Sequence, residues 1–336
     1  MQLSYSFVIP VYNRPEELRE LLLSFTLLNF DRPFEVVIVE DGSQLTAEDV
    51  VDGFRGQLSL LYLKKQNTGP GDSRNYGMDR ASGNYFLILD SDCILPVGYL
   101  REIDAALTKQ YVDCFGGPDK AHESFTKVQK AINYAMTSYL TTGGIRGKKK
   151  RVGKFQPRSF NMGISKKAFM SSGGFGRIHP GEDPDLSIRL WEKGFMTRLI
   201  PEAYVYHKRR IDFGRFISQV KKFGMVRPIL NKWHPETASL AFWFPALFCF
   251  GFIFALICIF MAAYPFKFLF IGIYLLYFAL VFLDASGNNK SLSVGVLSIV
   301  AVIFQFMGYG YGFLKSTILV NFSKRKPQEI FPELFF

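Results

Sequence analysis

The sequence predicts an α/β fold built on a mainly parallel sheet, followed by a helical region that spans a membrane. In the first half, short apolar segments rich in strand-forming residues alternate with segments whose leucines recur at helical spacing. This alternation is typical of parallel sheets with helices on both faces. In the last third, only Lys267, Asp284 and Lys290 are charged between Ala241 and Leu314. A segment so poor in charge favours membrane helices.

The elements of the first half follow one another in regular order. Strands are expected at residues 5–11, 34–39, 58–63 and 85–89. Helices are expected at residues 16–28 and 73–81, and a later amphipathic helix contains Leu186, Leu190 and Trp191. The acids of 181–185 stand before that helix, so helix capping is an alternative to a catalytic role for them.

Polar side chains follow three of these strands at the point where each strand ends. They are Tyr12, Asn13 and Arg14 after the first strand, Glu40 and Asp41 after the second, and Asp90 and Asp92 after the fourth. Right-handed crossovers bring such loops to one rim of a parallel sheet, where ligands bind. Each residue could instead be a cap or a turn former, but three converging loops favour a nucleotide site. No P-loop or G-x-G-x-x-G motif is present.

The pair Asp90-Ser91-Asp92 at the end of the fourth strand is the most informative motif. Two carboxylates at this spacing can share one hard divalent cation, and their oxygen ligands suit Mg²⁺ or Mn²⁺. A lone D-x-D also occurs in ordinary turns, so the motif gains weight from its place at a strand end.

Three apolar stretches, at residues 242–264, 266–283 and 292–313, are each near the length that crosses a bilayer. Buried core helices are the alternative, which the scarcity of charge disfavours. No basic segment followed by an apolar one opens the chain, so we expect no cleaved signal peptide and expect the first 240 residues to lie in the cytoplasm. The four cysteines show no metal-ligand spacing and are expected to be reduced thiols.

The net charge of +11 is concentrated just before these stretches. Between His207 and His234 lie eight basic residues: Lys208, Arg209, Arg210, Arg215, Lys221, Lys222, Arg227 and Lys232. Apolar residues recur among them at helical spacing, which predicts a basic amphipathic helix in the membrane interface within 211–240. Basic residues beside an apolar span mark the cytoplasmic side. Nucleic-acid binding is the alternative, and the adjoining spans argue against it, so no nucleic-acid partner is expected. The Gly- and Lys-rich stretch 143–154 is expected to be a solvated loop or, alternatively, a contact for an anionic substrate or the membrane.

Several motifs together resemble the family 2 glycosyltransferases with the GT-A fold. The match runs in order from residue 4 to residue 210. Its parts are the opening strand and loop Phe7–Arg14, the motif Val39–Ser43 with Glu40 where an aspartate is common, Asn67–Asn75, Leu89–Asp92, Phe160–Ile164 followed by Gly173–Phe175, and Gly181–Asp183. The resemblance is specific for the family and not for the sugar.

The resemblance implies inverting transfer of a sugar from a nucleoside diphosphate, UDP- or GDP-linked. It implies a donor-nucleotide site formed by Pro10, Tyr12, Arg14, Asp41, Arg74 and Asp90. It further implies Mg²⁺ or Mn²⁺ on Asp92 and Asp90, with His207 as a third ligand by its likeness to a late V-x-H motif. Asp183 would be the general base and Glu182 its neighbour that positions the acceptor or the loop. Asn161 and Met162 would lie on the acceptor side.

The domain prediction is a catalytic domain over 1–210, an interfacial helix over 211–240 and a membrane region with about three spans over 241–336. The predicted setting is the bacterial inner membrane, with a lipid-linked or other membrane-associated glycan as acceptor in cell-surface polysaccharide biosynthesis. Three alternatives remain: a polyprenyl-phosphate sugar synthase, a processive polysaccharide synthase, and a non-catalytic membrane-tethered nucleotide-sugar binder. Residues 219–223 only faintly echo the Q-x-x-R-W motif of processive synthases.

The predicted topology contains a conflict. Three spans would send the basic tail at Lys324, Arg325 and Lys326 to the side opposite the catalytic domain, against the positive-inside tendency. Either the tail is external, or one stretch is re-entrant or interfacial. We expect three spans, with the third, Gly-containing stretch as the weakest.

Overall fold

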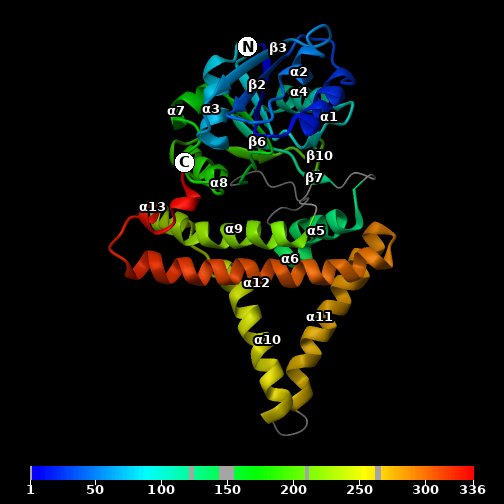
Figure 1. The fold of residues 1–336 in the computed structure, drawn as a ribbon, viewed down its shortest axis with the longest axis vertical. Coiled ribbons are helices and arrows are strands. Elements are labelled where there is room, and N and C mark those ends of the chain that lie inside the picture. The colour runs from blue at the N-terminus through cyan, green and yellow to red at the C-terminus, as the bar shows by residue number, and fades with distance from the viewer. Residues whose placement is uncertain (1, 121–124, 144–154, 209–211, 262–265) are drawn as a thin grey trace. The chain divides into compact units, whose positions relative to one another are not determined.

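The computed structural model describes residues 2–120, 125–143, 155–208, 212–261 and 266–336 (Figure 1). Most of the stretch 143–154 and the basic residues 209 and 210 therefore lie outside the described residues. The chain forms two compact units that interleave in sequence: Met1–His122 with Lys148–Lys208 and Phe335–Phe336 make the first, and Glu123–Gly147 with Arg209–Leu334 make the second.

The first unit is built on a seven-stranded sheet in the order β3-β2-β1-β4-β8-β6-β9. Its strands are β1 (Tyr5–Val11), β2 (Glu35–Asp41), β3 (Leu60–Lys65), β4 (Tyr85–Leu89), β6 (Cys114–Gly116), β8 (Asn161–Ser165) and β9 (Thr197–Leu199). The first four strands run parallel, and β8 runs antiparallel to both β4 and β6. The predicted α/β class with a mainly parallel sheet is confirmed.

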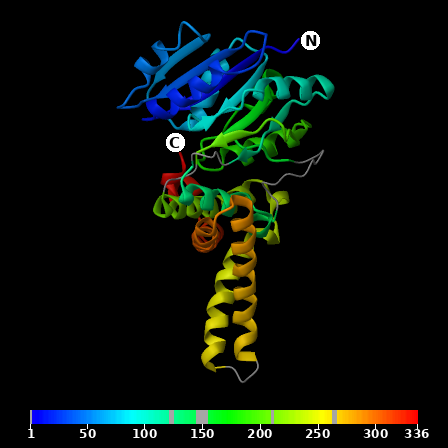
Figure 2. The same cartoon turned by 90° about the vertical axis from the view of Figure 1, so that its right-hand side faces the viewer.

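Helices cover both faces of this sheet (Figures 1 and 2). On one face, α1 (Pro15–Thr26), α2 (Glu48–Asp52) and α4 (Tyr99–Lys109) share a core with Phe7, Ile38 and Leu87. On the other, α3 (Pro70–Arg80), α7 (Lys166–Ser172) and α8 (Glu182–Glu192) pack on the alternate residues Val8, Val37 and Ile88. Because successive strand residues point to opposite faces, the nearly continuous apolar strands serve both cores.

The strands part at the rim where the predicted site lies. β1 pairs with β4 only from Tyr5 to Val8, while its pairing with β2 continues to Val11. Pro10 therefore lies beyond the last residue of β1 that pairs with β4. Because proline has no backbone N–H, it could not donate a hydrogen bond to β4, and at this position no such bond is needed. A second small sheet joins β5 (Cys93–Ile94), β10 (Val205–His207) and β7 (Asp119–Lys120) next to this rim.

The acids of 181–185 lie inside α8 rather than before it. Gly181 occupies the N-cap position and no side-chain hydrogen bond caps the helix, so the acids can favour this helix start only through their charge. Both acids stand in the first turn, where negative charge is favourable near the helix N-terminus. The four cysteines are free, as predicted.

The second unit is helical. Its members are α5 (Lys127–Thr137), α6 (Tyr139–Thr142), α9 (Phe213–Trp233), α10 (Phe244–Met261), α11 (Phe266–Asn289), α12 (Leu292–Phe322), α13 (Pro327–Ile330) and the short 3₁₀ segments η1 (Pro235–Thr237), η2 (Leu240–Trp243) and η3 (Pro332–Leu334). Among the residues that the structure describes, three helices are long and apolar enough to cross a membrane: Leu240–Met261, Phe268–Asn289 and Leu292–Phe322. Phe216 and Val220 on the apolar face of α9 pack with Val302 and Phe306 of α12, and the position of α9 in the membrane interface stays a prediction.

Candidate active site

Asp92 and His207 come together through the pairing of β5 with β10. His207 stands opposite Cys93 in this antiparallel pair, and the Lys208 amide donates to the Asp92 carbonyl. As a result His207 Nε2 lies 3.1 Å from Asp92 Oδ1, and its ring stacks on Phe160. Arg14 binds the other oxygen of Asp92 at 2.5 Å. Burial alone would raise the pKa of Asp92, but His207 and Arg14 outweigh burial and hold that pKa well below its usual range.

The donor atoms at Asp92 suit a divalent cation. Asp92, Cys93 and His207 each offer one ligand atom, all within 4.8 Å of one another. An octahedral ion with bonds of about 2.1 Å places neighbouring ligands about 3.0 Å apart, close to the separation of Asp92 Oδ1 and His207 Nε2. Carboxylate oxygens suit Mg²⁺ or Mn²⁺, whereas an imidazole is also a common ligand of Zn²⁺ and other transition metals. The Asp92 carboxylate therefore fits the predicted metal, and His207 as a ligand of that metal stays a prediction.

Asp90 faces a different partner from Asp92. Its carboxylate accepts from Arg74 Nη2 at 2.7 Å, while Arg74 Nη1 donates to Glu182 at 3.0 Å. Arg74 is almost fully buried and lies over the Phe175 ring. The two carboxylates of the D-x-D motif are therefore held by different arginines, and a metal contact of Asp90 stays a prediction.

Glu182 is a buried carboxylate with two cationic neighbours. Besides Arg74, it contacts His179 Nδ1 at 3.0 Å. Burial would raise the pKa of Glu182, but His179 and Arg74 lower it further than burial raises it. Burial likewise opposes charge on His179, and Glu182 more than compensates, so the pKa of His179 is raised. Glu182 is thus an ionised anchor that fixes Arg74 and the loop before α8.

Asp183, the next residue, is differently placed. Its carboxylate is 15 % exposed and forms an ion pair with Arg158 Nη1 at 3.6 Å. Its backbone carbonyl accepts from Ser187 one turn later, which holds the first turn of α8 in place. Of the two adjacent acids, Asp183 is therefore the one with the more accessible carboxylate. Asp185, by contrast, binds Arg189 through two nitrogens at 3.0 and 2.8 Å.

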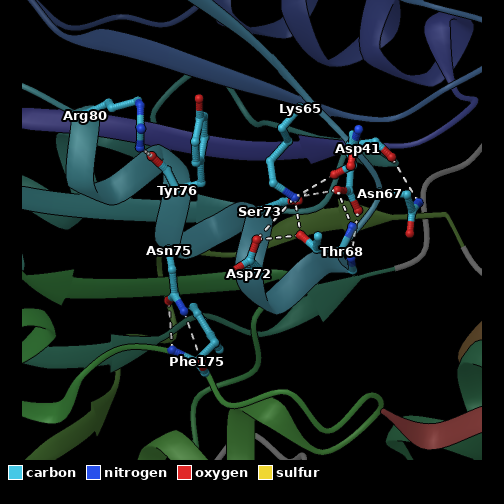
Figure 3. Close-up of polar contacts among 12 residues, drawn as sticks. Asp41, Lys65, Asn67, Thr68, Asp72, Ser73, Asn75, Tyr76, Arg80 and Phe175 are labelled. Carbon is cyan, nitrogen blue, oxygen red and sulfur yellow. Dashed lines mark hydrogen bonds and ion pairs between the residues drawn. The ribbon is translucent and has the colours of Figure 1, made fainter. Parts of the chain in front are cut away.

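Asp41 organises the loop that leads into α3 (Figure 3). One of its carboxylate oxygens accepts from Lys65 Nζ at 2.8 Å and from the Thr68 amide at 3.0 Å, and the other accepts from the Gly69 amide at 3.0 Å. Lys65 also contacts Thr68 Oγ1 and lies 3.2 Å from Asp72. The buried carboxylate thus fixes the loop through its own hydrogen bonds, and direct contact with a nucleotide stays a prediction.

We expect Lys65→Met to destabilise the protein and to weaken nucleotide binding. The pair is buried, with 11 % of the Lys65 side chain and 4 % of that of Asp41 exposed. Removing one partner of a buried ion pair lowers the free energy of unfolding by about 3–5 kcal/mol. We expect a value near the lower end of this range, because the Thr68 and Gly69 amides still donate to Asp41. Thermal unfolding of both variants checks this, with Lys64→Met as control, because Lys64 on the same strand pairs with Glu48 at the surface. An equal effect of the two changes would contradict the role given to Lys65.

The remaining predicted donor residues lie at the end of β1 and in the loop that follows it. Pro10 is partly buried and Tyr12 is 52 % exposed, so the Tyr12 ring is accessible to a ligand. Asn13 adopts a left-handed backbone conformation, and its side-chain oxygen accepts from the amides of Gln44 and Leu45 at 2.9 Å. This contact ties the loop after β1 to the loop after β2.

Asn161 and Met162 are both inaccessible in the described structure. Asn161 donates to the Ala203 carbonyl at 2.7 Å and accepts from Tyr99 Oη at 2.6 Å. Met162 lies in the core between the sheet and α3, α7 and α8. These contacts give both residues a structural role, and contact of either with an acceptor stays a prediction.

Three residues at the rim were missed by sequence reasoning: Lys65, Arg158 and His179. The register of β2 with β3 places Lys65 directly beside Asp41, so pairing the two strand ends would have identified it. His179 stands three residues before Glu182. Arg158 carried no sequence signal, because only an isolated bridge to Asn161 places it near α8.

The last residues of the chain also reach this unit. Phe335 forms an isolated bridge with Ile178, and the Phe336 amide donates to the Arg177 carbonyl at 3.2 Å. The Phe336 ring lies against Gly69, where a side chain would collide with it, and 6.0 Å from the His179 ring. The tail therefore contacts both the loop before α3 and the loop before α8.

The first unit is thus an α/β domain whose acidic, basic and imidazole groups gather at one rim of the sheet, where ligands of such domains bind. Residues 6–172 match the family model described as Glycosyl transferase family 2. Through this domain the chain belongs to the family 2 glycosyltransferases, as the resemblance predicted.

Comparison with known proteins agrees with this assignment. The poly(ribitol-phosphate) β-N-acetylglucosaminyltransferase TarS of Staphylococcus aureus is 31% identical over 114 residues, which are 33% of this chain and 20% of TarS. The chain thus spans about a fifth of that relative's length. The structure of S. aureus TarS 1–349 with UDP-GlcNAc shares the fold with a TM-score of 0.50 at 18% identity, covering 93% of this chain and 91% of that one. The mannosyltransferase PcManGT of Pyrobaculum calidifontis, in complex with GDP-Man and Mn²⁺, gives 0.56 at 14% identity, covering 90% and 88%.

Proposed function

We propose that the protein is an inverting, metal-dependent glycosyltransferase that moves a sugar from a UDP- or GDP-linked donor to a lipid-linked or other membrane-associated glycan. The observation that carries this proposal is the gathering of Asp92 and His207, the Asp90–Arg74–Glu182 chain and Asp183 on one rim of the sheet. The solved relatives whose titles name UDP-GlcNAc and GDP-Man with Mn²⁺ support the donor class and the metal.

Asp92 and His207 are the residues that would hold the cation, with Asp90 as a further predicted ligand. A divalent cation held there would supply positive charge for the diphosphate leaving group. Arg14, which binds Asp92, would add a second positive charge beside the same carboxylate. Tyr12 offers an exposed ring for the nucleotide base, and Asp41 keeps the loop before α3 in a fixed conformation.

In the proposed reaction, Asp183 removes the proton from the acceptor hydroxyl. The hydroxyl oxygen forms a bond to the anomeric carbon while the bond from that carbon to the diphosphate oxygen breaks, and the electron pair leaves with the nucleoside diphosphate. A single displacement of this kind inverts the anomeric configuration. Glu182 is less suited to the same task, because it is buried and because His179 and Arg74 lower its pKa, which makes it a weaker base.

A membrane-associated acceptor is proposed because the catalytic domain is joined to long apolar helices and a basic helix. Three helices of the chain have the length and hydropathy of membrane spans. A domain attached to the bilayer meets an acceptor confined to the same surface far more often than one free in solution. We accordingly propose the cytoplasmic face of a bacterial inner membrane as the site of the reaction, in cell-surface polysaccharide biosynthesis.

Nucleotide binding tests the proposal before any acceptor is known. The full chain, purified in lipid nanodiscs, is titrated with UDP, GDP, ADP and CMP, each with Mn²⁺ and with EDTA, and thermal unfolding is followed. We expect one uracil or guanine nucleotide to raise the unfolding temperature in Mn²⁺ and to lose most of that effect in EDTA, since a ligand at 100 times its Kd adds about 2.7 kcal/mol. If none of the nucleoside diphosphates raised the unfolding temperature, that result would contradict a donor site.

A further inference from the structure

The third apolar helix does not run alongside the other two. Helices α10 and α11 form a hairpin, and α12 runs across its base beside α9 (Figures 1 and 2). In the first view α12 lies lengthwise across the top of the hairpin, and in the second it is seen end-on while the hairpin keeps its full length. A bilayer crossed by α10 and α11 would therefore meet α12 in its plane.

The contact between α9 and α12 is close over much of their length. A side chain at Gly224 of α9 would collide with the Tyr309 carbonyl and the Phe313 amide, and one at Gly312 of α12 would collide with the Lys221 carbonyl. Lys232 also donates to the Val320 carbonyl at 3.0 Å. Small residues that let two backbones approach in this way fix a helix pair firmly. These contacts tie the orientation of α12 to that of α9.

The opposite side of α12 is an exposed apolar stripe. Val296, Met307 and Ile318 recur at intervals of 11 residues and are 54, 53 and 57 % exposed. At about 100° per residue, each interval turns the helix by about three full turns and 20°, so the three side chains share one face. This stripe extends along α12 for about 33 Å, from 22 residues at 1.5 Å each. A stripe of that length fits a helix lying in the upper part of a bilayer.

Basic residues flank the helix pair. Arg215 and Lys232 of α9 and Lys315 of α12 are exposed, and Lys324, Arg325 and Lys326 follow α12. Lys221 reaches over the Tyr311 ring, 4.9 Å from its centroid. Cations beside an apolar stripe are drawn to the anionic head groups of the cytoplasmic leaflet. A spanning α12 would instead carry Lys315 and the three tail cations toward the other side.

The last two residues of the chain restrict the number of times that it can cross the membrane. Phe335 and Phe336 belong to the first unit, where they contact Ile178 and Arg177. Residues 208 and 335 must therefore lie on the same side of the membrane, so the number of crossings between them is even. The spanning windows of α10 and α11 are only 17% and 11% buried within the protein, against 39% for α12. The two helices that leave most apolar surface for lipid are α10 and α11.

We propose that the protein crosses the membrane twice, through α10 and α11, and that α12 lies in the cytoplasmic interface with its Val296–Met307–Ile318 stripe toward the acyl chains and basic α9 above it. The tail then lies on the catalytic side. This arrangement resolves the conflict between three apolar stretches and the positive-inside tendency. It does not depend on the proposed sugar transfer.

Side-specific labelling tests the number of crossings. Single cysteines at Gln57→Cys in the catalytic unit, Met261→Cys at the end of α10 and Lys324→Cys after α12 are treated with a membrane-impermeant maleimide in oriented vesicles. All three positions are exposed, and the unmodified chain gives the background of its native cysteines. We expect Lys324→Cys to react from the same side as Gln57→Cys and from the side opposite Met261→Cys. Reaction of Lys324→Cys together with Met261→Cys would overturn the proposal.

Depth measurements test the position of α12 itself. Nitroxide labels at Val296→Cys, Met307→Cys and Ile318→Cys, in full-length protein with Cys249 and Cys258 replaced by alanine, report their depth through collision with oxygen and a water-soluble nickel chelate. We expect three similar, shallow depths, with Phe254→Cys in α10 as the deep control. A spanning helix would place the two outer labels near opposite faces, about 33 Å apart along its axis, and that result would overturn the proposal.

Discussion

We expect Asp92→Asn to reduce sugar transfer by about 10²–10³-fold and to abolish the effect of Mn²⁺ on nucleotide binding. Cation stabilisation of a leaving diphosphate is worth several kcal/mol, and each 1.4 kcal/mol is a factor of ten in rate. Asparagine keeps the size of the side chain but removes the charge that Arg14 and His207 face. Turnover with excess donor, and donor affinity with and without Mn²⁺, measure the effect.

Asp79→Asn is the matched control for this change. Asp79 is an exposed carboxylate near the end of α3, away from the rim, so its loss should leave turnover within about twofold, as for ordinary surface changes. Metal-stripped wild-type protein in EDTA should behave like Asp92→Asn. Full transfer in EDTA, or an Asp92→Asn variant that still responds to Mn²⁺, would exclude the proposed metal site.

Asp183→Asn is expected to remove most turnover while donor and metal binding stay near wild type. Loss of a general base typically costs a factor of about 10²–10⁴. Turnover and metal binding should respond separately because they depend on different residues. Asp183 contacts Arg158, and the group of possible metal ligands around Asp92 does not include Asp183. Turnover and nucleotide affinity should be measured on the same preparation.

Asp185→Asn separates catalysis from folding of α8. It removes the bonds to Arg189, and we expect a lower unfolding temperature with little change in turnover per folded molecule. Glu182→Gln should destabilise the protein as well, since it leaves Arg74 and His179 without their shared anion. Near-wild-type turnover of Asp183→Asn with intact folding would exclude Asp183 as base. That result would favour a lipid phosphate as acceptor, because a phosphate needs less help from a base.

The strands and helices of the first unit follow from local sequence patterns. Segments 5–11 and 85–89 coincide with β1 and β4, because continuous apolar runs bounded by turn residues leave little choice of boundary. The helix before β4 begins at Pro70 rather than near Ser73, since proline is favoured in a first helical turn. Local patterns cannot predict how the two units interleave in sequence, because packing decides that α5 joins the helical second unit.

Sequence patterns could predict those residues of the candidate site that lie directly after a strand. Asp41, Asp90 and Asp92 follow from the place where parallel strands end, and the likeness of β10 to a V-x-H motif indicated His207. The division of the acids among Arg14, Arg74 and Lys65 was not predictable, since it depends on side-chain directions at single positions. The orientation of α12 was hidden for a similar reason: hydropathy measures length and apolarity, not the direction in which a helix packs.

Transfer of labelled sugar is the measurement that tests the central claim most directly. Membranes containing the full chain are incubated with UDP- and GDP-linked radiolabelled sugars and Mn²⁺, and label in the lipid-extractable fraction is counted. We expect the wild-type chain to transfer label from one donor class to the lipid-extractable fraction. With Asp183→Asn, or with EDTA, we expect no label above background. Membranes in which neither donor class transfers label, or in which Asp183→Asn and Asp92→Asn both transfer it as well as wild type, would contradict it.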